Sequence, residues 1–109
     1  MGTVKSEDGA AGLAHPECEQ LELAAILHAL SDPMRLRIVK VLAIGEERTC
    51  SSIDLPVTKS TCTHHFRVLR EAGVIRQRQE GTARLNSLRR VDLEDRFPGL
   101  INAILRAHS

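Results

Sequence analysis

The chain has 109 residues, 42% of them hydrophobic and 27% charged, which is enough for one domain with a modest core. It has no run of about 18 apolar residues, which excludes a membrane-spanning helix, and its two Phe without Trp or Tyr argue against base-stacking platforms for single strands. The net charge is only +1, yet residues 59–90 hold eight Lys or Arg against two Asp or Glu, so any surface for nucleic acid is expected there.

The N-terminal third predicts a tail and two helices. Residues 1–16 are polar and aperiodic, and we expect a disordered tail. Residues 17–30 predict a helix whose apolar positions cover more than one face, so it needs two neighbours, such as its own domain and a partner subunit. Asp32 followed by Pro33 predicts the start of a second helix, which runs to about residue 43 with these side chains inward: Met34, Ile38, Val41 and Leu42.

The middle of the chain predicts a short element and then a long helix. Gly45 ends the second helix, and residues 49–55 predict a very short third helix that Pro56 stops. Thr58 is the predicted N-cap of the next helix, which runs to residue 72, and Gly73 supplies its C-terminal stop. On a helical period, one face of this segment is apolar and comprises Cys62, His65, Phe66, Leu69 and Ala72.

The opposite face of the 58–72 helix is polar. Hydrogen-bond donors lie on its N-terminal half, and its one acid, Glu71, lies at the far end. A helix that packs by one face and presents donors from the other has both properties of a DNA recognition helix. From this segment alone, a solvated surface helix in a small α domain is the plainer alternative.

A β-hairpin follows the long helix. Residues 74–79 and 83–88 alternate like strands, and the segment between them, Glu80-Gly81-Thr82, reads as the turn. Three basic side chains are expected to project from this hairpin: Arg76, Arg78 and Arg84.

The C-terminal segment predicts one more helix. Residues 92–97 form at most one helical turn, and Pro98 pushes Phe97 out of the helical region. A final helix is therefore expected from residue 98 to about residue 107, and its apolar residues are numerous for so short an element. Residues 17–30 and 98–107 together carry more apolar surface than a small monomer can cover, which predicts a dimer built from both.

Two helices joined by a short link, followed by a basic two-stranded hairpin, make a winged helix-turn-helix. Three stretches carry a more specific likeness: residues 29–38 (ALSDPMRLRI), residues 59–75 (KSTCTHHFRVLREAGVI) and Glu80-Gly81 in the hairpin turn. Through these stretches the chain resembles the ArsR/SmtB (arsenic-repressor-like) family of winged helix-turn-helix transcriptional repressors, over about residues 20–90.

The resemblance implies a mainly α fold with a small β-hairpin wing, spanning residues 17–109. It also implies a homodimer built from the first and last helices, which places two recognition helices in successive major grooves of a palindromic operator. The partner is then double-stranded DNA, and the function is sequence-specific repression of transcription. We expect no membrane association, no cofactor and no enzyme activity, because no phosphate-binding loop, Ser-His-Asp set or paired carboxylates are visible. Three cysteines without a disulfide pattern suit the cytoplasm.

The expected DNA contacts fall into two groups. Recognition-helix residues should meet the major groove: Lys59, Ser60, Thr61, Thr63, His64 and Arg67. Basic residues farther along should mainly meet phosphate or the minor groove: Arg70, Arg76, Arg78 and Arg84.

The metal sites of the family do not carry over. Its arsenic-type sensors have a Cys-x-Cys before the recognition helix, where this chain has Thr49-Cys50-Ser51, and the last helix lacks the ligand spacing of the zinc-type sensors. No metal is therefore assigned. Cys50 lies near the N-terminus of the short third helix, whose dipole is expected to lower the thiol pKa, so Cys50 and, with it, Cys18 are the candidate thiol sensors. Cys62 is expected to be buried and inert, and an organic inducer stays open as the alternative.

Two further interpretations remain. One is a metal-responsive repressor with non-standard ligands. The other is a winged helix that binds protein or RNA. The basic wing argues against protein binding, and the scarcity of aromatic residues argues against RNA binding.

Overall fold

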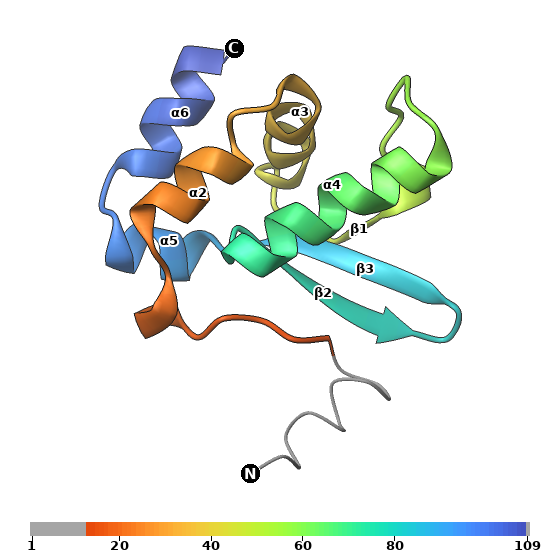
Figure 1. The fold of residues 1–109 in the computed structure, drawn as a ribbon, viewed down its shortest axis with the longest axis horizontal. Helices are drawn as coiled ribbons and strands as arrows, with labels where there is room; N and C mark the ends of the chain where they lie inside the picture. The colour runs from red at the N-terminus through yellow and green to blue at the C-terminus, as the bar shows by residue number, and fades with distance from the viewer. Residues whose placement is uncertain (1–12, 109) are drawn as a thin grey trace, which may run out of the picture.

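The computed structural model describes residues 13–108. In chain order, with η for a 3-10 helix, its elements are η1 (Cys18–Gln20), α2 (Leu23–Ala29), α3 (Pro33–Leu42), β1 (Arg48–Thr49), η2 (Cys50–Ser52), α4 (Lys59–Ala72), β2 (Ile75–Glu80), β3 (Ala83–Leu88), α5 (Arg90–Arg96) and α6 (Leu100–His108). The β2–β3 hairpin extends from beneath α4 toward one end of the molecule, while α2, α5 and α6 gather at the other end (Figure 1). The predicted mainly α fold with a β-hairpin wing is confirmed.

The predicted helix over residues 17–30 is broken in the structure. η1 is a single turn, Leu21 and Glu22 are extended, and α2 has only seven residues. The break lets Leu21, 1% exposed, pack on Gly73, where an added Cβ would lie 2.1 Å from Leu21 Cδ2. The prediction of one continuous helix is wrong because this tertiary contact outweighs local helical periodicity.

Residues 13–16, the end of the predicted tail, pack against the sheet, and residues 1–12 lie outside the described residues. The Gln77 amide on the edge strand β2 donates a hydrogen bond of 3.0 Å to His15 Nε2. Burial lowers the pKa of His15, which favours the neutral ring that this acceptor role requires. Nothing in the sequence pattern predicts this attachment.

Helix α3 begins as predicted. The Asp32 carboxylate accepts from the amides of Met34, at 2.8 Å, and Arg35, at 3.2 Å, and Pro33 is the first helical residue. The buried stripe consists of Arg35, Ile38, Val39 and Leu42. The predicted inward residues Met34 and Val41 are only half-buried, so the buried face is rotated from the predicted one.

Helix α4 has the predicted bounds and caps. The Thr58 hydroxyl accepts from the Thr61 amide at 3.2 Å, and Gly73 ends the helix in the left-handed region with φ of +89°. Among the predicted apolar face, His65, Phe66 and Leu69 are buried. α4 therefore lies with its polar face toward solvent.

The wing is part of a three-stranded antiparallel sheet in the order β1-β3-β2. β2 pairs with β3 from Ile75↔Leu88 to Glu80↔Ala83, which leaves Gly81-Thr82 as a two-residue turn. β1 was not predicted. It is held by Asn86, a fully buried residue whose amide donates to the Arg48 carbonyl at 3.0 Å and accepts from Gln77 Nε2 at 2.7 Å.

The segment from residue 49 to 55 contains only the three-residue turn η2 and not the predicted helix, and α5 is longer than the single turn expected there. Phe97 is outside the helical region, with φ of −134° and ψ of 74°, as predicted before a proline. Within residues 13–108, none of the helices could span a lipid bilayer.

Candidate nucleic-acid interface

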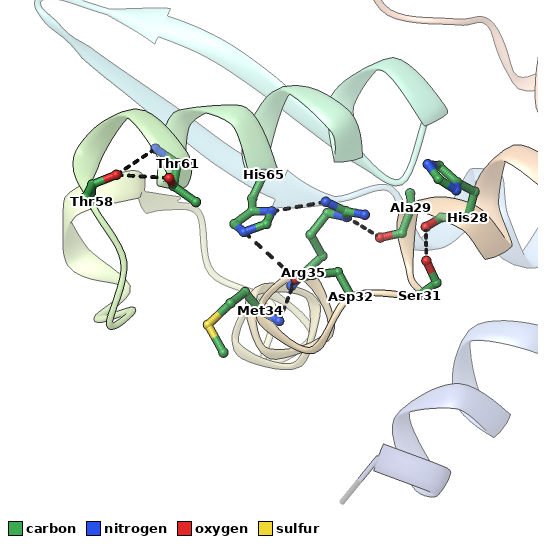
Figure 2. Close-up of polar contacts among 9 residues, drawn as sticks. All are labelled: His28, Ala29, Ser31, Asp32, Met34, Arg35, Thr58, Thr61 and His65. Atoms are coloured by element: carbon green, nitrogen blue, oxygen red, sulfur yellow. Dashed lines mark hydrogen bonds and ion pairs between the residues drawn. The ribbon is translucent and has the colours of Figure 1, made fainter.

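The outer face of α4 is exposed over the N-terminal half of the helix. The predicted major-groove residues are all exposed: Lys59, Ser60, Thr61, Thr63, His64 and Arg67. The Thr61 hydroxyl takes part in the helix cap, where the Thr58 hydroxyl donates to it at 2.9 Å (Figure 2). Ser60 Oγ lies 3.4 Å from the same Thr58 hydroxyl, whereas no hydrogen bond within the described residues engages the remaining side chains: Lys59, Thr63, His64 and Arg67.

A buried polar contact fixes α4 against the rest of the domain. Arg35 on α3 is 8% exposed; its Nε donates to the Ala29 carbonyl at 2.6 Å, and its Nη1 lies 3.1 Å from His65 Nδ1 (Figure 2). Asp32 Oδ2 lies 3.9 Å from His65 Nε2. The end of α2, the start of α3 and the middle of α4 thus meet at one network.

A basic groove lies between α4 and the wing. Its volume is about 720 Å³, and its walls include residues from α4, β2 and β3. Four basic residues and no Asp or Glu line it; they are Lys59, Arg67, Arg70 and Arg84. Among the described residues, Lys59, Arg67 and Arg84 have no acidic partner, so their charges are available to an anionic ligand.

Arg78 is exposed on the wing but is already paired. Its Nε and Nη2 donate to the Glu47 carboxylate at 2.9 and 2.8 Å, and Glu80 lies 3.1 Å from Nη2. These bonds raise the pKa of Arg78, and they lower the pKa of Glu47. Arg76 also has an acidic neighbour, Asp92, at 3.6 Å. The sequence predicted these arginines but not their partners, because Glu47 is 31 residues away from Arg78 in the chain.

Arg70 lies in the contact between α4 and β2. Its side chain is only 12% exposed, and Nη1 donates to Gln77 Oε1 at 3.0 Å. Burial lowers its pKa, while Glu71, 3.8 Å away, opposes that shift. Arg70 therefore differs from the three unpaired cations of the groove, although its position on the groove wall agrees with the sequence.

The three cysteines do not form one cluster. Cys50 is half-buried, with Asn86 Nδ2 3.7 Å from its sulfur, and burial raises its pKa. The predicted lowering of the Cys50 pKa is wrong, because η2 is too short to provide a strong dipole and desolvation prevails. Cys18 lies against α5, and burial and the charges of Asp92 and Asp95 raise its pKa.

Cys62 is half-buried, not fully buried as predicted. Cys62 and Cys50 line a common cavity of about 650 Å³, beside the start of α4 and the tip of the wing. Burial raises the pKa of Cys62, and nearby Cys50 adds to that shift. No group of three His, Cys, Asp or Glu residues in the described part of the chain could hold a metal ion.

Arg35 is the residue that sequence reasoning missed. It follows Asp32-Pro33 and lies at i, i+3, i+4 and i+7 with Ile38, Val39 and Leu42, so it interrupts an otherwise apolar stripe. A charged residue at such a position needs a buried partner, and that requirement is the signal that could have identified it.

Comparison with known proteins adds a consistent set of likenesses. Residues 30–78 match the model of a helix-turn-helix domain family. An uncharacterized HTH-type transcriptional regulator, YceK of Bacillus subtilis (strain 168), is 33% identical over 84 residues, which cover 74% of this chain and 84% of that protein. The arsenical resistance operon repressor of Staphylococcus xylosus is 32% identical over 68 residues, which cover 62% of this chain and 65% of that protein.

Solved structures show the same likeness in three dimensions. The transcriptional repressor BigR from Xylella fastidiosa has a TM-score of 0.62 and 26% identity, over 78% of this chain and 84% of that one. A structure described as a possible transcriptional regulator for arsenical resistance has a TM-score of 0.58 and 31% identity, over 79% of this chain and 80% of that one.

Proposed function

The chain belongs to the ArsR/SmtB family of helix-turn-helix transcriptional regulators, and from that premise we propose that it represses transcription by binding a palindromic operator as a homodimer. It is a DNA-binding regulator and not an enzyme. We propose that it binds DNA in the cytoplasm, where its three free cysteines would stay reduced.

The observation that carries this function is the acid-free basic groove beside an exposed, donor-rich helix face. Duplex DNA presents closely spaced phosphates, so three cations without acidic partners are the groups that bind it best: Lys59, Arg67 and Arg84. On α4, the side chains of Ser60, Thr63, His64 and Arg67 then read base edges in the major groove.

The other predicted contacts differ in their expected contributions. Arg76 and Arg78 must exchange carboxylate partners for phosphate, so their net contribution to affinity is smaller than that of Arg84. Arg70 acts mainly by holding β2 against α4. Thr61 contributes mainly through the cap of α4.

The dimer surface is proposed on α2 and α6, at the end of the molecule opposite the wing tip (Figure 1). Leu23 and Leu27 of α2 are 46% and 45% exposed, and Ile104 and Leu105 of α6 are half-buried. Water-exposed leucines beside a partly covered apolar helix are the surface that a second copy would bury. Two subunits related by a two-fold axis would then match a palindromic site.

Any thiol-reactive inducer would act through Cys50. This thiol borders both the basic groove and the adjoining cavity, so a bound group there would disturb the surface that meets DNA. Cys62 shares that cavity, whereas Cys18, in η1, lies against α5 and does not line it. Release of the operator by a thiol reagent in the wild type, but not in Cys50→Ser, would support this route. Equal release in both would rule it out.

The test of the function uses the purified protein and fluorescence-labelled DNA from upstream of its own gene. Arg67→Ala should weaken operator binding by about 1–3 kcal/mol and reduce the preference for operator over unrelated DNA. Lys40→Ala, which removes an equal charge from the exposed side of α3, is the matched control. It should change operator affinity and the preference for operator DNA only slightly. Unchanged affinity and preference in Arg67→Ala would contradict the assignment.

A further inference from the structure

His65 is the polar residue on the buried face of α4. It is 7% exposed, and the other buried residues of that helix are Phe66 and Leu69. Its Nδ1 lies 3.1 Å from Nη1 of Arg35, and Nε of the same arginine donates to the Ala29 carbonyl at the end of α2 (Figure 2). This contact is the polar tie between the recognition helix and the helices behind it.

The chemistry of Arg35 fixes the proton on His65. A guanidinium only donates, so Nδ1 must accept and the ring proton must lie on Nε2. Nε2 faces Asp32 Oδ2 at 3.9 Å, and that carboxylate is already committed to two amides at the start of α3. The neutral ring with Nε2–H is therefore the form that this site accommodates.

The groups facing His65 oppose one another. Arg35 on α3 and His64 on α4 disfavour a second proton on the ring, while Asp32 at the start of α3 favours it. Burial disfavours it most, and the pKa of His65 is lowered overall. A proton on Nδ1 would replace the hydrogen bond to Arg35 by two donors facing each other, each with a positive charge.

We propose that His65 is a positioning residue for DNA binding, which holds α4 in its operator-reading orientation only while Nδ1 accepts from Arg35. This inference rests on the proposed function. Because His65 lies on α4 next to His64 and two residues before Arg67, loss of its tie to Arg35 lets α4 turn and displaces the base-reading face. Acid should therefore release the operator before it unfolds the protein.

The test must separate His65 from His64, which is exposed on the DNA-facing side. Protonation of His64 adds a positive charge near phosphate and should strengthen binding, so His64→Gln serves as the reference background. In that background, His65→Asn keeps an acceptor oxygen where Nδ1 lies but cannot take a proton in this range. His15, His28 and His108 are unchanged in both proteins, so their effects cancel.

In His64→Gln, operator affinity should fall between about pH 7.5 and about pH 5.5, by up to about tenfold, which is the loss expected when the buried hydrogen bond is fully broken. In His64→Gln/His65→Asn the affinity should change little over the same range. Circular dichroism at each pH confirms that both remain folded. Equal acid sensitivity in the two proteins would overturn the inference.

Two further measurements keep the positioning role distinct from a merely structural one. Nitrogen NMR of the wild-type histidine rings, without DNA, should show His65 with Nδ1 unprotonated and Nε2 protonated at neutral pH, and the reverse would overturn the inference. His65→Leu, which leaves Arg35 without its acceptor, should bind the operator about tenfold less tightly at neutral pH while still folded. If the wild type binds no operator at neutral pH, the proposed function itself fails.

Discussion

The Arg78–Glu47 ion pair gives a quantitative prediction about the wing. Two hydrogen bonds of 2.9 and 2.8 Å hold Arg78 on the Glu47 carboxylate, and both side chains are at least 39% exposed. Glu47→Gln removes that carboxylate and leaves Arg78 with only the exposed Glu80, 3.1 Å from Nη2, so Arg78 becomes more available to phosphate. An exposed ion pair contributes about 0–1 kcal/mol, so the fold should be little affected.

Each added phosphate contact steepens the dependence of log affinity on log salt by about 0.9. With one Arg78 in each subunit of the proposed dimer, Glu47→Gln should steepen the slope by up to about 1.8 and strengthen binding at low salt. Between about 50 and 200 mM salt, the ratio of variant to wild-type affinity should then change by roughly tenfold. Fluorescence anisotropy on the operator across that range measures it directly.

Glu46→Gln is the matched control. Glu46 is the adjacent exposed glutamate, and within the described residues it has no basic partner. Glu46→Gln therefore changes the net charge by the same amount as Glu47→Gln but releases no arginine. A slope in Glu47→Gln no steeper than in Glu46→Gln would refute the reasoning. The effect should also disappear in Arg78→Ala/Glu47→Gln.

Three other predictions concern packing, association and pH. Gly73→Ala should lower the free energy of unfolding in urea by about 2–5 kcal/mol, because it combines a strained φ of +89° with a Cβ 2.1 Å from Leu21 Cδ2. Gly81→Ala, where φ is +63° and the space around the Cβ is open, should lower it by only about 1–2 kcal/mol. Equal losses in the two variants would contradict the packing of Leu21 on Gly73. In sedimentation experiments, Leu27→Glu should convert the proposed dimer to a monomer. Ile44→Glu should not, because this residue after α3 is 76% exposed and lies outside the proposed dimer surface. A wild type that is monomeric at micromolar concentration would refute the dimer. Burial lowers the pKa values of His15 and His65, so the unfolded chain binds more protons and the free energy of unfolding should fall as the pH drops below about 6.5. Unchanged stability from about pH 7.5 to about pH 5.5 would contradict both assignments.

The sequence predicted well what local patterns determine. α4 has a capping Thr58, a stop at Gly73 and a clear apolar face, and the structure has all three. The alternation predicted the hairpin, although the predicted turn included Glu80, which pairs with Ala83 at the end of β2 in the structure. The exposed polar face of α4 could be predicted because it is the complement of the buried one.

The features that the sequence did not predict depend on distant partners. Leu21 breaks the first helix because it packs on Gly73, and β1 exists because its backbone meets Asn86 from far along the chain. The pKa of Cys50 depends on burial and not on its place in a short helix. Arg78 was expected to be available, but Glu47 from another segment holds it.

The most direct test of the account is a hydroxyl-radical footprint of the wild-type protein on the DNA upstream of its own gene. We predict protection of two symmetric half-sites, centred about 10 base pairs apart, with two chains bound per site. Arg67→Ala should lose this pattern at concentrations where the wild type protects fully. Protection of a single unpaired site by one chain, or none that depends on sequence, would contradict a homodimer that reads a palindromic operator with α4.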